Sequence, residues 1–187
     1  TVEYFRSMED EEVRTLELPA ISAVAESHFN LGESLLKRAR WVKLKGNEKK
    51  MQKAIKQKLT LMNDAKTVYE QVISYGHPGW MIAAYSQLGL AYRDLANAVE
   101  NTEVPRKLRR MPDAVEEYKT VMAEKAKPIR AKAIASYAKA LSIARDEHWF
   151  NKYSQRAENA LAQLALTDRS IKESRLKPER SRANSGL

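Results

Sequence analysis

The chain has 187 residues, 43 % of them hydrophobic, and a formal net charge of +9. This length and composition fit one globular domain with a substantial core. The absence of cysteine excludes disulfides and thiolate chemistry, and no apolar run approaches the ~18 residues that a membrane-spanning helix needs.

Glycine and proline are scarce, with six of each, so long stretches of Ala, Leu, Lys, Glu and Gln run uninterrupted. These residues favour helix. No pair of alternating apolar runs is joined by a hairpin turn such as Asn-Gly. The sequence therefore predicts an all-α protein.

The chain opens with an acidic, weakly periodic segment, 1–18. Residues 1–20 hold six acidic side chains and two arginines, a net charge of −4. Apolar residues recur at helical spacing from Pro19 onwards, which predicts a first helix over 19–45. Gly46 and Asn47 supply a stop and a new N-cap.

The next helix shows the clearest periodicity, and Gly76 ends it, so that 19–75 forms a first helical hairpin. Pro78 opens a third helix, 78–101. Asp113 followed by Glu116 fits a capping box and predicts a fourth helix over 113–145. The third and fourth helices form a second hairpin, 78–145.

Pro128 lies inside the fourth helix and predicts either a kink or two abutting helices. A fifth helix is expected over 148–165, with Trp149 and Tyr153 in the core. The basic remainder, 166–187, has little to bury and is expected to be flexible. Two interpretations of this tail stay open, a linker and an arm for an acidic partner.

The two hairpins share a spacing of packing residues. The sequence around Tyr85-x-x-Leu88-Gly89-x-x-Tyr92 is followed by Ala133-x-x-x-Tyr137-x-x-Ala140. The first hairpin has the weaker counterparts Leu31-Gly32 with Leu35, and then Ala65, Tyr69 and Val72. These spacings resemble the tetratricopeptide repeat, in which a glycine lets two helices approach closely.

A standard repeat of this kind has about 34 residues, whereas Gly32 and Gly89 stand 57 residues apart. The resemblance thus implies a helical solenoid of antiparallel hairpins with elongated helices, which forms one domain over 19–165. The fifth helix would cap the end of this solenoid. Residues 60–165 also resemble tetratricopeptide-like proteins of deltaproteobacterial cell envelopes, including parts of the gliding-motility machinery. That likeness implies a protein-binding scaffold, a subunit of a larger envelope assembly, and a periplasmic or envelope location; the residues themselves give no compartment.

The residues give no sign of catalysis. His28, His77 and His148 stand far apart, and none has a second ligand at a metal-binding spacing. The sequence contains neither a glycine-rich phosphate loop nor a serine elbow. We therefore expect no enzyme activity, no catalytic or metal-ligating residues and no cofactor or small-molecule substrate.

Two surfaces are candidates for binding partners. By the repeat pattern, one concave face should carry Phe29, Glu33, Lys37, Ser86, Leu90, Arg93 and Asp94. The other is the basic tip 37–58, which holds ten Lys or Arg and a single acid, Glu48. Its expected binding residues are Arg38, Arg40, Trp41, Lys43, Lys45, Lys49, Lys50 and Lys53.

Three interpretations of the basic tip remain open. It is a solvated hairpin end, a contact for an acidic protein, or a site for nucleic acid or anionic membrane. A one-sided charge exceeds what solubility needs, and Trp41 among cations suits stacking or an interface. The spacing of the residues shows no nucleic-acid motif. A protein-binding scaffold is the main expectation, and a polyanion-binding module is the alternative.

Overall fold

The computed structural model describes residues 18–43 and 48–176. This part of the chain consists of five α-helices and their connections, with no strand. The helices are α3 (Leu18–Trp41), α4 (Glu48–Ser74), α5 (Pro78–Glu100), α6 (Pro112–Asp146) and α7 (Lys152–Leu176). The predicted all-α class is confirmed.

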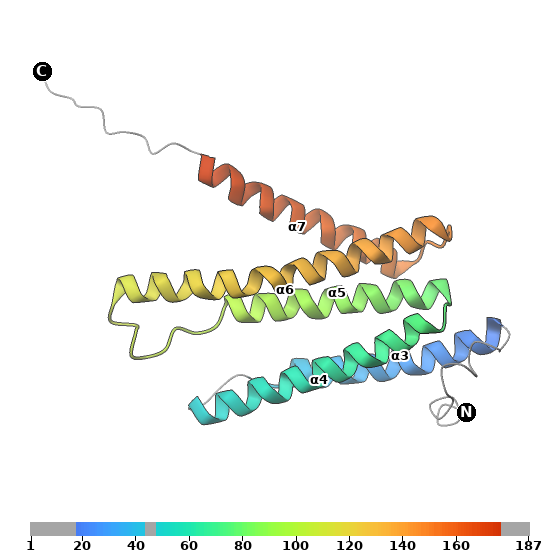
Figure 1. The fold of residues 1–187 in the computed structure, drawn as a ribbon, viewed down its shortest axis with the longest axis horizontal. Coiled ribbons are helices and arrows are strands. Elements are labelled where there is room, and N and C mark those ends of the chain that lie inside the picture. The colour runs from blue at the N-terminus through green and yellow to red at the C-terminus, as the bar shows by residue number, and fades with distance from the viewer. Residues whose placement is uncertain (1–17, 44–47, 177–187) are drawn as a thin grey trace, which may run out of the picture.

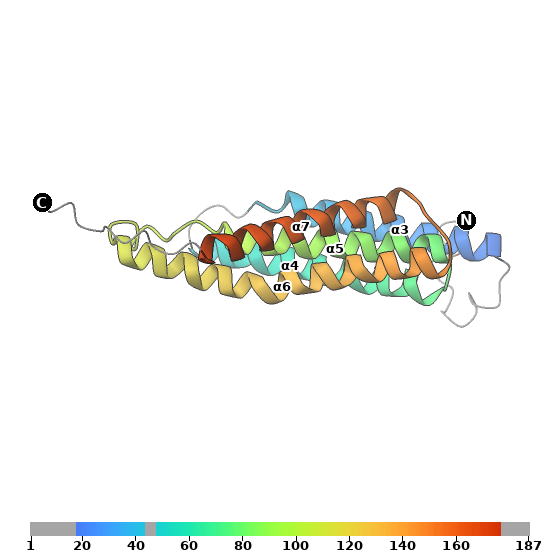
Figure 2. The ribbon, with the colours of Figure 1, turned by 90° about the horizontal axis from the view of Figure 1, so that it is seen from above.

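The helices form two antiparallel pairs and a single last helix (Figure 1). α3 packs on α4, and α5 packs on α6 along most of the length of α5. α5 also touches α3, α4 and α7, so it is the central element of the fold. Figure 2 shows that all five helices run along the long axis of the molecule.

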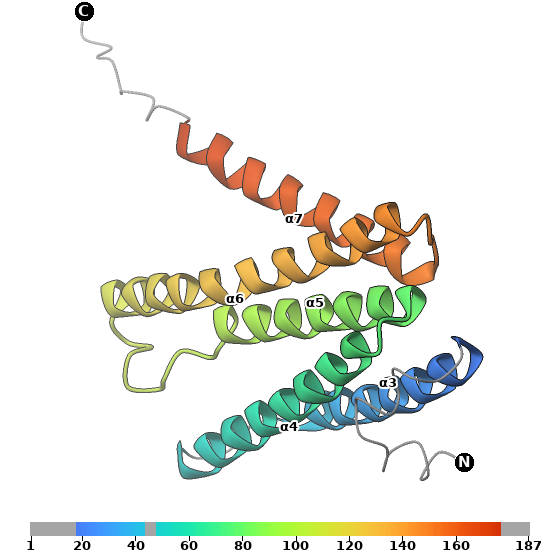
Figure 3. The ribbon, with the colours of Figure 1, turned by 45° about the vertical axis from the view of Figure 1, so that its right-hand side comes forward.

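The two pairs and α7 splay apart along the molecule, as Figure 3 shows. The start of α4 and the connection between α5 and α6 lie toward one end of the molecule (Figure 1). The short turns α4–α5 and α6–α7 lie at the other (Figure 1). The basic tip is therefore well separated from the α6–α7 turn.

A close glycine–tyrosine contact holds each pair together. A Cβ atom added at Gly32 of α3 would lie 2.7 Å from Cε1 of Tyr69 on α4. A Cβ atom at Gly89 of α5 would lie at the same 2.7 Å from the ring of Tyr137 on α6. Both tyrosine side chains are fully buried. The sequence motif predicted this close approach, and it is present in both pairs.

Two clusters of buried side chains form the core, and α5 contributes to both. Ala83, Ala84 and Leu88 join the cluster between α3, α4 and α5. Ile82 joins the second cluster, which lies between α5, α6 and α7. The half-buried Tyr153 of α7 packs against both clusters, so α7 is tied to the whole body of the fold.

Most predicted helix ends agree with the structure, and α4 ends before Gly76, whose φ is +74°. α3 ends at Trp41, earlier than the predicted 45. The predicted stop at Gly46 and Asn47 lies outside the described residues, as do Lys45 and the acidic segment 1–17.

The start of α6 differs from the prediction. Its N-cap is Met111, which makes no side-chain capping bond, and Pro112 occupies the first turn. The expected capping box of Asp113 and Glu116 is therefore wrong, because Pro112 already starts the helix with a fixed φ. Asp113 still lies in the first turn, where a carboxylate complements the helix dipole. The helix continues through Pro128 as one element.

α7 begins at Lys152, later than the predicted 148. His148 has a φ of +51°, which interrupts helical geometry after α6. Asn151 then caps the new helix: its Oδ1 accepts the backbone N–H groups of Tyr153 at 2.8 Å and Ser154 at 3.1 Å. Ser154 Oγ in turn accepts the Asn151 N–H at 3.0 Å. This reciprocal cap sets the helix start.

α7 ends at Leu176, beyond the predicted end at 165. Its backbone is thus helical over the first part of the segment predicted to be a flexible tail. The remainder of that segment, 177–187, lies outside the described residues.

We expect Gly89→Ala to destabilise the fold by about 1–3 kcal/mol, because the new methyl group overlaps the ring of Tyr137. Urea unfolding followed by circular dichroism measures the change. Without the overlap, Ala would stabilise a helix over Gly by about 0.8–1 kcal/mol. The sign of the change in stability therefore tests the contact, and a variant more stable than the parent would contradict it.

Candidate functional site

Two of the three histidines, His28 and His77, pack against aromatic rings. The Nδ1 atom of the buried His28 lies 3.1 Å from the carbonyl oxygen of Val24, and its ring meets Tyr75 edge-on. His77 packs edge-on against Trp149. Over residues 18–43 and 48–176 the structure shows no cluster of three or more potential metal ligands.

None of the helices in the described part of the chain is both long and apolar enough to span a membrane.

The predicted concave face does not exist as an open surface. Phe29 is only 3 % exposed. Its ring packs against Tyr69, Trp80 and Tyr153, with centroid distances of 5.2–5.6 Å. The prediction that Phe29 contacts a partner is therefore wrong, because three aromatic rings from α4, α5 and α7 already surround it.

Three more residues of that predicted surface serve the fold. Glu33 accepts a 2.6 Å hydrogen bond from the hydroxyl of Tyr69. Ser86 is fully buried, and the structure records no hydrogen bond for its hydroxyl among the described residues. Asp94 forms a 3.3 Å ion pair with Arg40 and lies 3.6 Å from Arg93.

The remaining three members of the set do not lie together. Leu90 is half-buried. Arg93 lines a shallow cavity of about 310 Å³ whose other walls include Lys152 and Arg156 of α7. Lys37 belongs to a different groove, on the outer side of the α3–α4 pair. α7 covers part of this predicted face, since its Tyr153 packs on Phe29 and its Lys152 and Arg156 lie beside Arg93.

The basic tip contains a groove between the end of α3 and α4, which we call the basic groove. Its volume is about 610 Å³, and its walls are Ser34, Lys37, Arg38, Trp41, Val42, Lys43, Ala54, Gln57 and Leu61. Three predicted tip residues, Arg38, Trp41 and Lys43, thus lie together, and Lys37, which was predicted for the concave face, lies beside them. The indole of Trp41 is 74 % exposed at the rim.

Other cations of the tip lie outside the basic groove. Arg40 is turned to the opposite side of α3, where it pairs with Asp94 of α5. Lys58 donates a 3.0 Å hydrogen bond to the Ala39 carbonyl near the end of α3. Burial lowers the pKa of Lys58, against a smaller opposing effect of Asp94. Arg40 thus ties α3 to α5, and Lys58 ties α4 to α3.

The predicted tip residues on α4 are exposed but absent from the groove walls. They are Lys49, Lys50 and Lys53.

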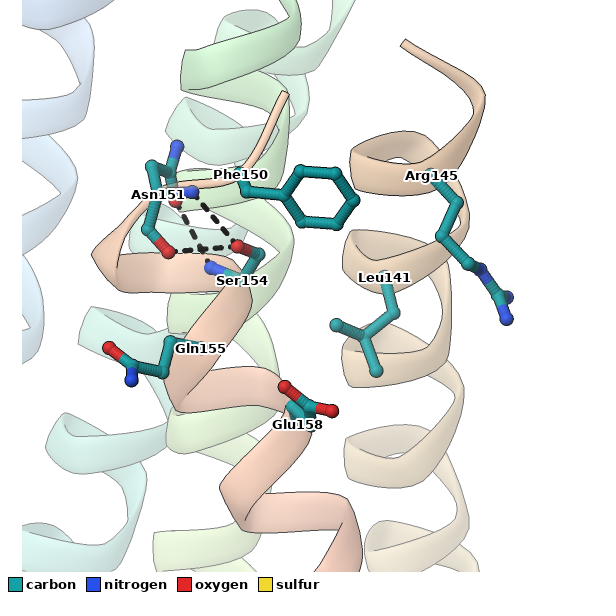
Figure 4. Close-up of a pocket in the computed structure, with 7 residues that line it drawn as sticks. All are labelled: Leu141, Arg145, Phe150, Asn151, Ser154, Gln155 and Glu158. Atoms are coloured by element: carbon teal, nitrogen blue, oxygen red, sulfur yellow. Dashed lines mark hydrogen bonds between the residues drawn. The ribbon is translucent and has the colours of Figure 1, made fainter. Parts of the chain in front are cut away.

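A second groove lies at the α6–α7 turn, and the sequence analysis missed it. It has a volume of about 480 Å³ and is lined by Leu141, Arg145, Phe150, Asn151, Ser154, Gln155 and Glu158. Figure 4 shows Phe150 extending across the space between the two helices. Its side chain is 71 % exposed. The hydrogen bonds between Asn151 and Ser154 fix the turn beside it.

The position of Trp149 explains why this groove was missed. The sequence placed Trp149 in the core of a helix, but it is 45 % exposed. Its indole Nε1 would lie 2.9 Å from a Cβ atom at Gly79, so the ring rests on the start of α5. The aromatic pair Trp149–Phe150 was the available signal, since it follows a charged stretch and precedes an Asn-x-x-Ser cap.

No protein-family model, curated protein or solved structure matches this chain.

We expect Phe29→Ala to lower the free energy of unfolding by about 3–5 kcal/mol, as removal of a buried aromatic ring does. Urea unfolding measures this loss. Ile134→Ala, at a position 41 % exposed on α6, is the control and should change stability little. Equal losses in the two variants would contradict the core position of Phe29.

Tyr69→Phe keeps the ring against Gly32 but removes the hydrogen bond to Glu33. We expect a loss of about 1.5–3 kcal/mol at neutral pH, typical of a bond to a charged group. Burial, and then the bond to Glu33, raise the pKa of Tyr69.

A raised pKa means that the folded state holds the tyrosine proton more tightly than the unfolded chain. Tyr69 therefore stabilises the fold fully below pH ~10, and this contribution is lost as pH rises further. Between about pH 9 and 11, the free energy of unfolding should fall more steeply with pH in the parent than in Tyr69→Phe. Parallel pH curves would refute the assignment.

Proposed function

We propose that this protein is a non-enzymatic scaffold that binds other proteins through surface grooves on stacked helix pairs. One observation carries the proposal. The two most exposed large hydrophobic side chains in the described part of the chain, Trp41 and Phe150, both stand at the rims of open grooves.

Such positions have a clear energetic meaning. Burial of apolar surface stabilises a complex by about 25 cal/mol per Å², and aromatic residues dominate the binding energy of protein interfaces. A ring that protrudes beside a groove can be buried by a partner without rearrangement of the core. Most wall residues of both grooves belong to packed helices, so the binding surface is largely preformed.

The likeness to tetratricopeptide repeats supports the same function. In both helix pairs a glycine of the first helix contacts a tyrosine of the second, and α5 lies between the first pair and α7. We interpret this order as an elongated tetratricopeptide-like solenoid in which α7 begins a further unit. A role in a cell-envelope assembly, such as the gliding-motility machinery, is implied by the resemblance alone.

Polyanion binding is the second candidate function, and the charge of the basic groove favours it. Lys37, Arg38 and Lys43 lie in the groove wall, and the described residues offer none of them an ion pair. Such cations attract phosphates as well as carboxylates. Nucleic acid or an anionic membrane would then occupy the tip.

A peptide-display selection on the immobilised full chain tests the scaffold function. We expect enriched peptides whose affinity falls at least tenfold in Phe150→Ser or in Trp41→Ser, because each change removes the protruding ring of one groove. Val121→Ser, at an exposed position outside both grooves, is the matched control. A selection without enrichment, or peptides that bind all variants equally, would reject the proposed function.

A further inference from the structure

The side of α3 that forms the basic groove is a single helix face. Ser34, Lys37, Arg38 and Trp41 follow the spacing i, i+3, i+4 and i+7, which places side chains in one row. The core side chains of α3, such as Phe29 and Leu36, belong to other rows. On α3, the basic groove is thus built by residues that the hydrophobic core does not use.

The charge of this groove is entirely positive. Its nine lining residues include Lys37, Arg38 and Lys43 but no Asp or Glu. The side chains of these three residues are exposed. Asp94 of α5 pairs with Arg40, which lies outside the groove. A ligand that brings carboxylates would therefore meet unneutralised cations.

The groove is also apolar. Val42, Ala54 and Leu61 contribute to its walls, and Leu61 is only 7 % exposed. Beside them stands the indole of Trp41. A ligand that fills this space therefore needs an apolar side chain in addition to negative charge.

Three cations of the tip line the groove. Lys49 and Lys56 of α4 are exposed, but they lie about a third of a turn or more away from the row Ala54, Gln57 and Leu61 that faces the groove, whereas Lys50 falls in line with that row one turn before Ala54. Affinity for nucleic acid grows with the number of cations that contact phosphates and falls steeply with salt. Only three cations line the groove, so its chemistry fits a short acidic polypeptide better.

We propose that the basic groove binds an acidic segment of another protein that carries a bulky apolar side chain. Carboxylates of the segment face Lys37, Arg38 and Lys43, and the apolar side chain packs beside Trp41 over Val42 and Leu61. The inference rests on the proposed scaffold function and names the partner class for one of its two grooves.

Fluorescence anisotropy with the full chain and a labelled peptide Glu-Asp-Glu-Leu-Phe-Asp-Glu tests this inference at ~50 and ~150 mM salt. We expect saturable binding at both salt concentrations, with weaker affinity at the higher one because exposed charges are screened. The same peptide with Ser-Ser in place of Leu-Phe should bind at least tenfold more weakly.

Two charge-reversal variants of equal charge change locate the site. Lys37→Glu with Arg38→Glu should weaken peptide binding at least tenfold, whereas Lys49→Glu with Lys56→Glu, on another side of α4, should weaken it less than threefold. Trp41→Ala should also lower the affinity for the peptide at least tenfold. Circular dichroism and unfolding midpoints verify that each variant is folded.

Four results would overturn the inference. The first is no saturable binding of the acidic peptide, and the second is an equal loss in both charge-reversal variants. The third is tighter binding of single-stranded RNA, duplex DNA or phosphatidylserine vesicles than of the peptide, which would assign the groove to a polyanion. The fourth is a tenfold gain in peptide affinity in the combined variant Glu9→Gln, Asp10→Asn, Glu11→Gln and Glu12→Gln. This gain would make the chain's own acidic segment the occupant of the basic groove.

The display selection separates this inference from the scaffold function. Peptides that depend on Phe150, together with failure of the acidic peptide, would overturn the inference and leave the function standing.

Discussion

In both helix pairs a tyrosine ring lies directly against the backbone of a glycine on the neighbouring helix. Any side chain at Gly32 or Gly89 would overlap the rings of Tyr69 or Tyr137. This contact sets the distance between the helices of each pair and buries two large rings. It also brings the Tyr69 hydroxyl to Glu33, so that a carboxylate on the first helix is tied to the second. The remaining packing is arranged around these two contacts.

α5 turns the two pairs into one body, because opposite sides of this helix serve different clusters. Ala83 and Ala84 face the first pair, and Ile82 faces α6. α7 then adds Tyr153 to both clusters and, with Trp80, closes the aromatic group around Phe29. Aromatic rings thus fill the space around Phe29 between α3, α4, α5 and α7.

The two outer grooves differ in chemistry as well as in place. The α6–α7 groove combines Phe150 with one cation, Arg145, and one carboxylate, Glu158, so its charge is balanced. The basic groove has cations alone around its apolar floor. Under the proposed scaffold function, these two grooves on different helices, α3–α4 and α6–α7, would hold two chemically different segments at once. The long helices between them set the separation.

The sequence by itself determined the helical class, most helix ends and the close approach of helices at Gly32 and Gly89, because these depend on local periodicity, turn residues and residue size. It also found Arg38, Trp41 and Lys43, since a run of one-signed charge is visible without a fold. Tertiary structure alone decided that Phe29 is core, that Arg40 ties α3 to α5 and Lys58 ties α4 to α3, and that Phe150 protrudes. Each of these depends on the direction of a distant helix. Local spacing cannot supply that direction, because it places a side chain on a face of its own helix but does not say which other helix covers that face.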